Sequence, residues 1–452
     1  LKELGITHVQ LMPVLDFTSV DEKHPDLFYN WGYDPGHYRI VEGSYCSDPD
    51  DPYGRINELR QAVSDFHRNG IGVIFDVVYN HMRERFRSDF EKIVPHYFFR
   101  VSDAGEPSDG SFCGNDFDSR RPMARKMILD SVSTMMEIYG ADGFRFDLMG
   151  IMDIETMNRI EKMVHVIKPD AVLLGEGWNM PTLMNDEDKA MIANQAKLPR
   201  IGQFNDFFRD RIKGSSDGYR LSERGYATGD LNDITAASSC IAGSSVNKAG
   251  YKKMFDSPQQ SINYVDCHDG VTLWDKLKVS NSGSDNEVRK RRMKLNMAFV
   301  LLSQGVPFIH GGSEFCRGKQ GVANSYASSD AINMYRWERC DSYAEEVSYV
   351  KDLISLRKQL PALRMASSEE IGKHLEIFHH HGMIEARFTD MEAYGCLELR
   401  VLFNGTLVDQ PYPTDVPFTV LFDEKGLVPE KKETASLEVK ALSTAVIIRK
   451  HV

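Results

Sequence analysis

The stretch ADGFRFDL, from Ala141 to Leu148, is a short apolar run that ends in charged residues, and similar runs recur along the chain. Amphipathic stretches separate these runs, and this alternation is typical of parallel strands joined by helices. The runs that fit are THVQLMPV (Thr7–Val14), IGVIFDVV (Ile71–Val78), ADGFRFDL, AVLLGEGW (Ala171–Trp178), IGQFNDFF (Ile201–Phe208), SINYVDC (Ser261–Cys267) and GVPFIHG (Gly305–Gly311). The sequence therefore predicts an α/β fold with seven parallel strands.

Helical patterns fill the segments between the runs. Apolar residues share one face before Gly70 and again after the capping residue Asp153, and further helices are predicted at about 123–139, 286–303 and 343–359. Connections 15–54 and 79–122 are longer than usual and follow carboxyl ends of strands, where barrel enzymes place their active sites. A closed (β/α)8 TIM barrel needs eight strands. We therefore expect a barrel that lacks its first strand, with LKELG at the start as the tail of the preceding helix.

The pattern changes after Pro361. The strings LEIFHHHGMIEARF, CLELRVLFNGT, VPFTVLF and SLEVKALSTAVIIRK alternate as strands with no helix between them. We expect a barrel domain over residues 1–362 and a C-terminal antiparallel β-sandwich over residues 363–452.

The composition is that of an ordinary globular protein, with 42% hydrophobic and 27% charged residues. The net charge of −12 argues against nucleic acid as a partner. No apolar run is long enough for a membrane-spanning helix, and the amino terminus lacks a signal segment. The seven cysteines form no CxxC pair, which favours a bacterial cytoplasmic protein. Because the chain begins with Leu1 rather than Met, an extracellular location stays open, and oligomeric state is not indicated.

Chemically active side chains stand at or just after the ends of several predicted strands. They are Asp76, His81, Arg145, Asp147, Glu176, His268 and Asp269. Any one of them alone has an ordinary structural explanation, such as a buried ion pair. Several acids on one rim cost stability, and function is the better explanation for the whole set.

The strings DVVYNH, GFRFDLMG, GEGW and YVDCHD resemble the four motifs of the α-amylase superfamily in order and spacing. The resemblance implies that Asp147 is the nucleophile, that Glu176 is the general acid and base, and that Asp269 grips sugar hydroxyls. An oxocarbenium-like transition state needs an anion below the anomeric carbon and a proton for the leaving oxygen, with the two carboxyl groups about 5 Å apart in retaining enzymes. Arg145 is expected to keep Asp147 ionised.

Further substrate-binding residues follow from the same resemblance. His81 and His268 are expected to donate hydrogen bonds to sugar hydroxyls. The string YNWGYDP (Tyr29–Pro35) resembles type I pullulanases, which implies that Tyr33 is the platform below the cleaved sugar and that Asp34 also binds substrate. Trp178 and Trp274 are candidates for stacking on glucose units outside the cleavage site. The alternative for Tyr29 and Trp31 is that they only pack the loop.

Two positions depart from the family pattern. Gly270 stands where the family usually has Asn, and Asn179 follows GEGW where pullulanases commonly have Asp. Either change can alter affinity for sugar, but both leave the three carboxylates in place.

The resemblance therefore implies a retaining hydrolase that cleaves α-1,6 linkages in branched α-glucans. Alternatives are an amylopullulanase, another debranching enzyme of the superfamily, a transglycosylase and a non-catalytic starch-binding protein. No cofactor is expected. The acidic run Asp48, Asp50 and Asp51 is a calcium candidate, but its spacing is that of a solvated turn rather than a calcium loop.

Overall fold

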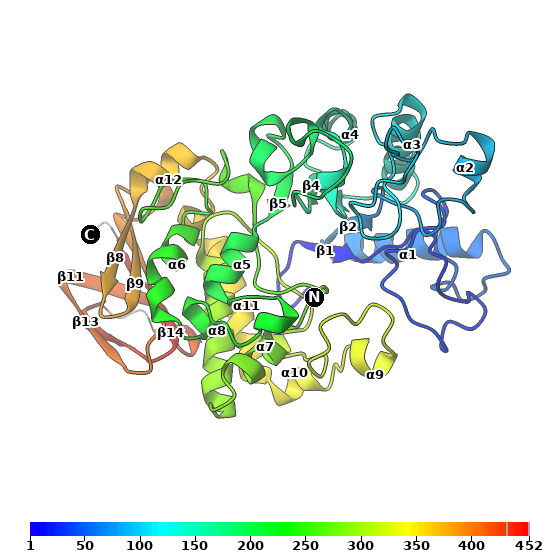
Figure 1. Cartoon of the computed structure of the whole chain (residues 1–452). Helices are drawn as coiled ribbons and strands as arrows, with labels where there is room; N and C mark the ends of the chain where they lie inside the picture. Colours follow the sequence, from blue (N-terminus) through cyan, green and yellow to red (C-terminus); the bar gives the residue numbers. More distant parts are fainter. Residues whose placement is uncertain (431–432, 451–452) are drawn as a thin grey trace.

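Seven parallel strands form one sheet in chain order, from β1 at one end to β7 at the other. Figure 1 labels β1, β2, β4 and β5 of this sheet near the middle of the molecule. The computed structural model describes residues 1–430 and 433–450. The strands are β1 (His8–Leu11), β2 (Gly72–Val77), β3 (Gly143–Phe146), β4 (Val172–Gly175), β5 (Gly202–Phe204), β6 (Ser261–Asn263) and β7 (Val306–Pro307). Each lies within one of the predicted runs, which confirms the prediction of a TIM-barrel-like domain with seven strands.

The side chains of each strand alternate between two environments. On β3, Phe144 and Phe146 pack in the apolar layer shared with the surrounding helices. Arg145 points the other way, and its guanidinium lies 5.9 Å from the ring centre of Phe204 on β5. Alternate residues of a strand face opposite sides of a sheet, so a charged residue between two phenylalanines faces the barrel interior.

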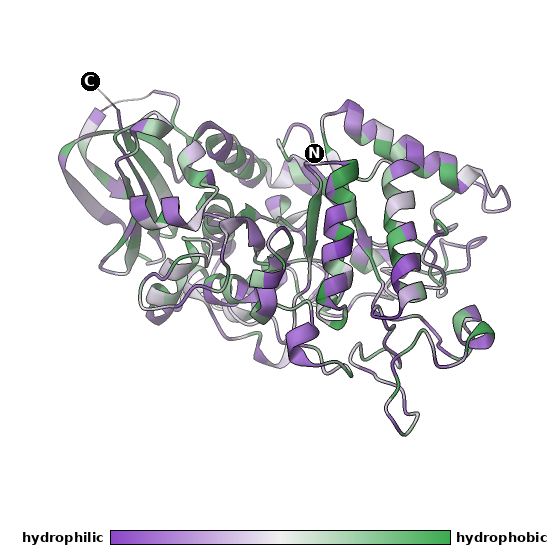
Figure 2. Cartoon of the chain, turned by 90° about the horizontal axis from the view of Figure 1, so that it is seen from above, coloured by the Kyte–Doolittle hydropathy of each residue, from purple (hydrophilic) through white to green (hydrophobic). Residues whose placement is uncertain are grey.

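Helices cover the outside of this sheet, and their apolar stripes face inward (Figure 2). All five predicted helices are confirmed, as α1, α3, α4, α8 and α11. The α-helices are α1 (Gly54–Arg68), α2 (Asp89–Ile93), α3 (Pro122–Glu137), α4 (Ile154–Ile167), α5 (Asp206–Ile212), α6 (Ile234–Cys240), α7 (Leu273–Ser280), α8 (Asn286–Leu302), α9 (Asp330–Asn333), α10 (Arg339–Ser342), α11 (Ala344–Gln359) and α12 (Ser368–His374).

One of the predicted strands runs into an α-helix. The run Ile201–Phe208 is extended only as far as Phe204, and α5 begins two residues later. Asn205 explains the change, because its side-chain oxygen accepts a hydrogen bond from the Phe208 N–H (2.9 Å) and caps the helix. An apolar run alone does not separate the end of a strand from the start of a helix.

The C-terminal region is an antiparallel sheet that folds over on itself. Its strands are β8 (Leu375–His380), β9 (Met383–Thr389), β10 (Glu398–Asn404), β11 (Gln410–Asp423), β12 (Gly426–Leu427), β13 (Glu433–Val439) and β14 (Ser443–Arg449). The long strand β11 pairs with β13 along its first part and with β14 along its last part, with a register shift between Pro413 and Phe418. This shift lets the strands enclose a small apolar core that includes Leu402, Phe418 and Ile447, as expected for the predicted sandwich. The boundary between residues 362 and 363 stays a prediction.

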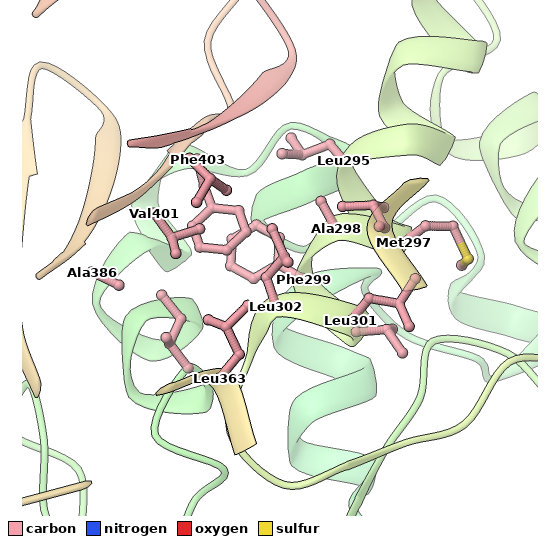
Figure 3. Close-up of a cluster of buried hydrophobic side chains, with 14 of the residues drawn as sticks. Leu295, Met297, Ala298, Phe299, Leu301, Leu302, Leu363, Ala386, Val401 and Phe403 are labelled. Atoms are coloured by element: carbon pink, nitrogen blue, oxygen red, sulfur yellow. The ribbon is translucent and has the colours of Figure 1, made fainter. Parts of the chain in front are cut away.

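The other face of this sheet packs on the barrel helices (Figure 3). The rings of Phe299 on α8 and Phe403 on β10 stack with their centres 4.1 Å apart. The two regions therefore share one apolar core. Over the described residues, every helix is too short or too polar to cross a membrane.

Candidate active site

Arg145 is the centre of the polar cluster at the carboxyl ends of the strands. Its Nη1 donates to Asp147 Oδ1 and to Asp76 Oδ1, both at 2.9 Å. Its Nη2 pairs with Glu176 Oε1 on the next strand end. One buried guanidinium thus bridges the two residues predicted as nucleophile and general acid.

Backbone and amide groups fix the second oxygen of each carboxylate. Asn80 Nδ2 donates to Asp147 Oδ2 (2.8 Å), and the Leu148 N–H donates to Glu176 Oε2 (3.1 Å). Leu148 has a left-handed backbone with φ of 38°, which is unfavourable for a branched side chain. Strain of this kind concentrates at functional sites, and here it aims an N–H at Glu176.

Two carboxyl groups at this centre have raised pKa values. Burial raises the pKa of Glu176 to about 7, against the opposing effect of Arg145. Burial also raises the pKa of Asp76 to about 7. A carboxylic acid that keeps its proton near neutral pH suits a general acid. Asp269, by contrast, is exposed on the same rim, and its charge contributes to the raised pKa of Glu176.

Aromatic rings form one wall of the site. The Tyr33 hydroxyl donates to Asp76 Oδ2 (2.6 Å), and the Tyr33 ring stacks on the His268 ring with centres 5.1 Å apart. Trp31 is buried and meets the His268 ring edge-on at 5.0 Å. Burial and the nearby Arg145 charge hold the pKa of His268 well below its usual range, so its imidazole is neutral at neutral pH. Because Trp31 is buried, it packs the loop, which is the alternative interpretation given above for this residue.

Several predicted substrate-binding residues make contacts within the protein. The His81 ring is buried, and its nitrogens face Asn80 Oδ1 (2.6 Å) and the Tyr33 carbonyl (3.0 Å). The Asp34 carboxylate is buried and accepts hydrogen bonds from the Ser19 hydroxyl (3.0 Å) and the Thr18 hydroxyl. The predicted contacts of His81 and Asp34 with sugar stay predictions.

The two tryptophans proposed for outer stacking differ. Trp178 is half-buried and packs against the interior cluster that includes Phe204 and Tyr264. Trp274 is only 5% exposed, because α7 turns it into the core against Tyr343. The expectation that Trp274 stacks on sugar was wrong, since a buried ring presents no face to a ligand.

Sequence reasoning gave no role to three residues that contact the centre. Asp76 and Asn80 lie in the string DVVYNH, so their position at a strand end was visible but their contacts were not. Lys319 comes from the distant loop after β7, and its ammonium donates to the His268 carbonyl (2.7 Å). Nothing in the local sequence marks it, because the contact joins residues far apart in the chain.

The predicted calcium candidate lies elsewhere. Asp48, Asp50 and Asp51 belong to an exposed turn in which Lys23 pairs with Asp50 (2.8 Å). A separate acidic group contains Asp16, Glu22 and Glu42, and backbone N–H groups or Arg55 engage two of its three carboxylates. The prediction that no cofactor is needed stays a prediction.

The geometry agrees with comparisons to known proteins. The alpha-amylase family description "Alpha amylase, catalytic domain" matches residues 1–103. A crystal structure of the Paenibacillus barengoltzii pullulanase, in complex with maltohexaose and alpha-cyclodextrin, is similar to this chain, with 40% sequence identity and a TM-score of 0.94. The match covers 70% of the Paenibacillus chain. This chain belongs to the type I pullulanase family.

Two Bacillus subtilis comparisons support this membership. The B. subtilis pullulanase is 43% identical over 452 residues, which are 99% of this chain and 62% of that protein. The structure of B. subtilis type I pullulanase with maltose has a TM-score of 0.97 and 42% identity, and the match covers 100% of this chain and 64% of that one. The chain thus spans less than two thirds of the length of these relatives.

Proposed function

We propose that this chain is a retaining glycoside hydrolase that cleaves α-1,6-glucosidic linkages in branched α-glucans such as pullulan, amylopectin, glycogen or limit dextrins. The observation that carries the proposal is the bridge from one Arg145 guanidinium to both Asp147 and Glu176. Two carboxyl groups on one guanidinium fit the separation of about 5 Å that retaining enzymes use.

In the first step, Glu176 and Asp147 act from opposite sides of the glycosidic bond. Glu176 gives its proton to the bridging oxygen, so the bond from that oxygen to the anomeric carbon breaks and the leaving chain departs as an alcohol. Asp147 forms a covalent ester with the anomeric carbon. Asn80 and Arg145 support this role, because their N–H groups orient the Asp147 carboxylate.

In the second step, water replaces the leaving chain. Glu176, now ionised, takes a proton from water as the oxygen attacks the anomeric carbon, and the bond to Asp147 breaks. The product keeps the configuration of the substrate, and both carboxyl groups return to their starting protonation states. Arg145 limits the charge repulsion between them, because it pairs with both.

The choice of α-1,6 linkages rests on the loop that carries Tyr33. Its string YNWGYDP resembles the type I pullulanases, and Tyr33 stacks on His268 and donates a hydrogen bond to Asp76. The bound maltose and maltohexaose in the two related structures support an α-glucan as the substrate class.

Asp147→Asn and Glu176→Gln test the proposal. Each variant should lower pullulan hydrolysis by at least about a thousandfold, because each removes a group that acts in bond breaking. The wild-type chain should release mainly maltotriose from pullulan and leave amylose nearly intact, measured by chromatographic sizing. Matched circular dichroism spectra serve as the folding control. Short maltooligosaccharides from amylose at a comparable rate would replace this proposal with the amylopullulanase alternative.

A further inference from the structure

A long loop after β2 comes close to the candidate nucleophile. It follows β2 and returns to the barrel at Asn115 and Phe117. The Phe117 N–H donates to the Asn80 carbonyl (2.8 Å), and the Asn115 side chain exchanges two hydrogen bonds with the backbone of Met82. Asn80 itself contacts Asp147, so the base of this loop lies one residue from the reaction centre.

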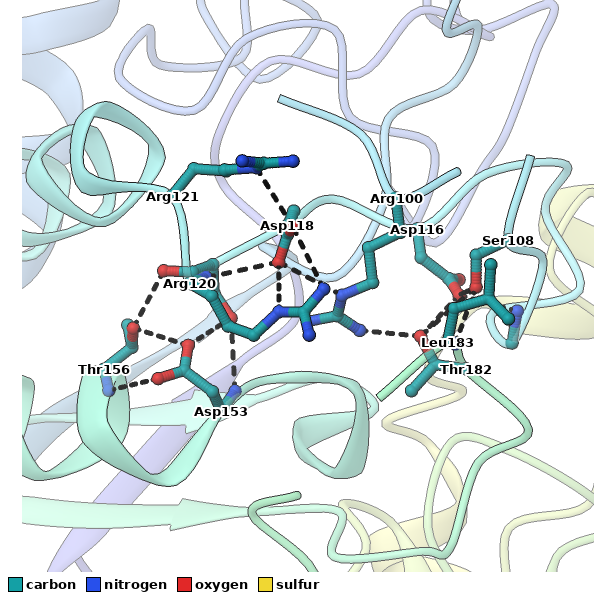
Figure 4. Close-up of polar contacts among 12 residues, drawn as sticks. Arg100, Ser108, Asp116, Asp118, Arg120, Arg121, Asp153, Thr156, Thr182 and Leu183 are labelled. Carbon is teal, nitrogen blue, oxygen red and sulfur yellow. Dashed lines mark hydrogen bonds and ion pairs between the residues drawn. The ribbon is translucent and has the colours of Figure 1, made fainter. Parts of the chain in front are cut away.

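Buried polar contacts hold the loop rigid (Figure 4). Asp116 is fully buried and accepts hydrogen bonds from the Gly110 N–H (2.9 Å), the Ser111 N–H (2.9 Å) and the Thr182 hydroxyl (2.7 Å). Arg100 also donates to the Thr182 hydroxyl (2.6 Å). Thr182 belongs to the segment after β4 that carries the general acid. The loop is therefore bonded both to the segment that follows β2 and to the segment that follows β4.

The tip of this braced loop is Phe112. Its backbone is left-handed, with φ of 60°, and its side chain is 74% exposed. Both features are unfavourable: a left-handed backbone suits glycine, and an exposed ring leaves apolar surface in water. The neighbour Gly114, also at positive φ, donates to Asp109 and completes the turn. A strained and exposed aromatic residue on a rigid loop points to a role in binding.

The tip lies close to the candidate nucleophile. Phe117, at the base of the loop, donates its N–H to the Asn80 carbonyl, and the Asn80 amide in turn donates to the Asp147 carboxylate (2.8 Å). The hydrogen bonds from Asn115 to Met82 place the same tip beside the end of β2. Phe112 is thus three residues from a loop base that is bonded beside the candidate nucleophile.

We propose that Phe112 is a specificity-determining residue that stacks on a glucose ring of the α-glucan next to the ring being cleaved. The inference rests on the proposed function of the site. The flat apolar face of an aromatic ring matches the C–H face of glucose, and a pre-positioned ring loses little freedom on binding. The left-handed backbone holds the ring in an exposed position, where a bound glucan chain contacts it.

Three substitutions separate the contribution of the Phe112 ring from that of the strained backbone. Phe112→Ala removes the ring and keeps the strain, Phe112→Trp keeps an aromatic face, and Phe112→Gly removes both ring and strain. We expect KM for pullulan to rise about tenfold in Phe112→Ala and Phe112→Gly, with kcat within about twofold of wild type. Phe112→Trp should stay within about threefold of the wild-type KM. Phe112→Gly should also raise Tm, which a purely structural role for the ring does not predict.

Tyr53→Ala is the matched control, since Tyr53 is a 72% exposed aromatic residue at the start of α1. The KM of this variant for pullulan should equal that of the wild type.

Calorimetric titration with maltohexaose on the same proteins distinguishes a failure of the stacking role from a failure of the proposed function. If the wild-type chain binds and cleaves α-glucans and Phe112→Ala does so equally well, the stacking role is wrong and the proposed function stands. If the wild-type chain neither binds nor cleaves any α-glucan, both are wrong. A KM increase in Phe112→Trp equal to that in Phe112→Ala also overturns the stacking role.

Discussion

At the scale of single residues, the burial of Glu176 is the feature with the clearest chemical consequence. A general acid works only in its protonated form, and the pKa of Glu176 is raised to about 7. We expect kcat/KM on pullulan to fall about tenfold per pH unit above pH 7, because the protonated fraction falls by that factor. The pH profile of initial rates measures this. An alkaline limb centred near pH 5 would contradict the assignment of Glu176 as the acid.

The same raised pKa predicts a change in stability that does not depend on activity. The folded chain binds the Glu176 proton more tightly than the unfolded chain does, so this group stabilises the fold fully below its unfolded pKa of about 4.5. That contribution is lost as the pH rises through about 7. Glu176→Gln should therefore gain unfolding free energy relative to wild type between pH 4.5 and pH 7.5, as measured by urea denaturation. A difference that stays constant with pH would show that Glu176 titrates normally.

At the scale of elements, Lys319 shows how the loop after β7 supports the site. It is 1% exposed, its ammonium donates to the His268 carbonyl (2.7 Å) and the Ser325 hydroxyl (3.0 Å), and it lies 5.0 Å from the Trp31 ring centre. Lys319→Met removes these bonds and leaves the His268 carbonyl without this donor. Since a small displacement of catalytic groups costs up to about a hundredfold, we expect kcat to fall between about tenfold and a hundredfold.

The control for this prediction is Lys278→Met. The Lys278 ammonium pairs with the Asp275 carboxylate (3.0 Å), which also accepts a hydrogen bond from the Lys319 backbone N–H. The Lys278 side chain is half-exposed on α7. Asp275 keeps its hydrogen bonds from the Lys319 and Gly321 N–H groups when Lys278 is replaced, so kcat should not change. Equal kcat values for wild type and Lys319→Met, with both folded by circular dichroism, would remove Lys319 from any positioning role.

The elements also show what local sequence can predict. Strands and long helices were predictable because their apolar periodicity is local, and the strand ends carried Asp147, Glu176 and Asp269 to one rim. Among the bonds that orient these acids, the Arg145–Asp147 pair was predicted, but the contacts of Asn80, Leu148 and Lys319 were not. Lys319 reaches His268 from a loop more than fifty residues away, and Trp274 looked available for stacking until α7 turned it inward. Such contacts depend on how elements pack, which no single stretch of sequence encodes.

At the scale of the whole molecule, the barrel and the C-terminal sheet share the core around Phe299 and Phe403. Phe403→Ala leaves a cavity between α8 and β10. We expect it to lower the unfolding free energy by about 3–5 kcal/mol, the usual cost of removing a buried phenylalanine. Leu407→Ala is the control, because Leu407 is 68% exposed after β10 and should cost no more than about 0.5 kcal/mol. Urea denaturation measures both.

The shared core makes a stricter prediction about cooperativity. All four tryptophans precede residue 362, so their fluorescence reports on the barrel, whereas hydrogen exchange in β14 reports on the sheet. A sheet with its own independent core would lose protection before the fluorescence changes. Because β10 and β14 contribute Val401, Phe403 and Val446 to the barrel-side cluster, we expect one transition, and Phe403→Ala should shift both signals to lower urea together. Loss of β14 protection at a clearly lower urea concentration than the fluorescence change would show that the sheet unfolds as a separate unit and that the Phe299–Phe403 contact does not couple it to the barrel.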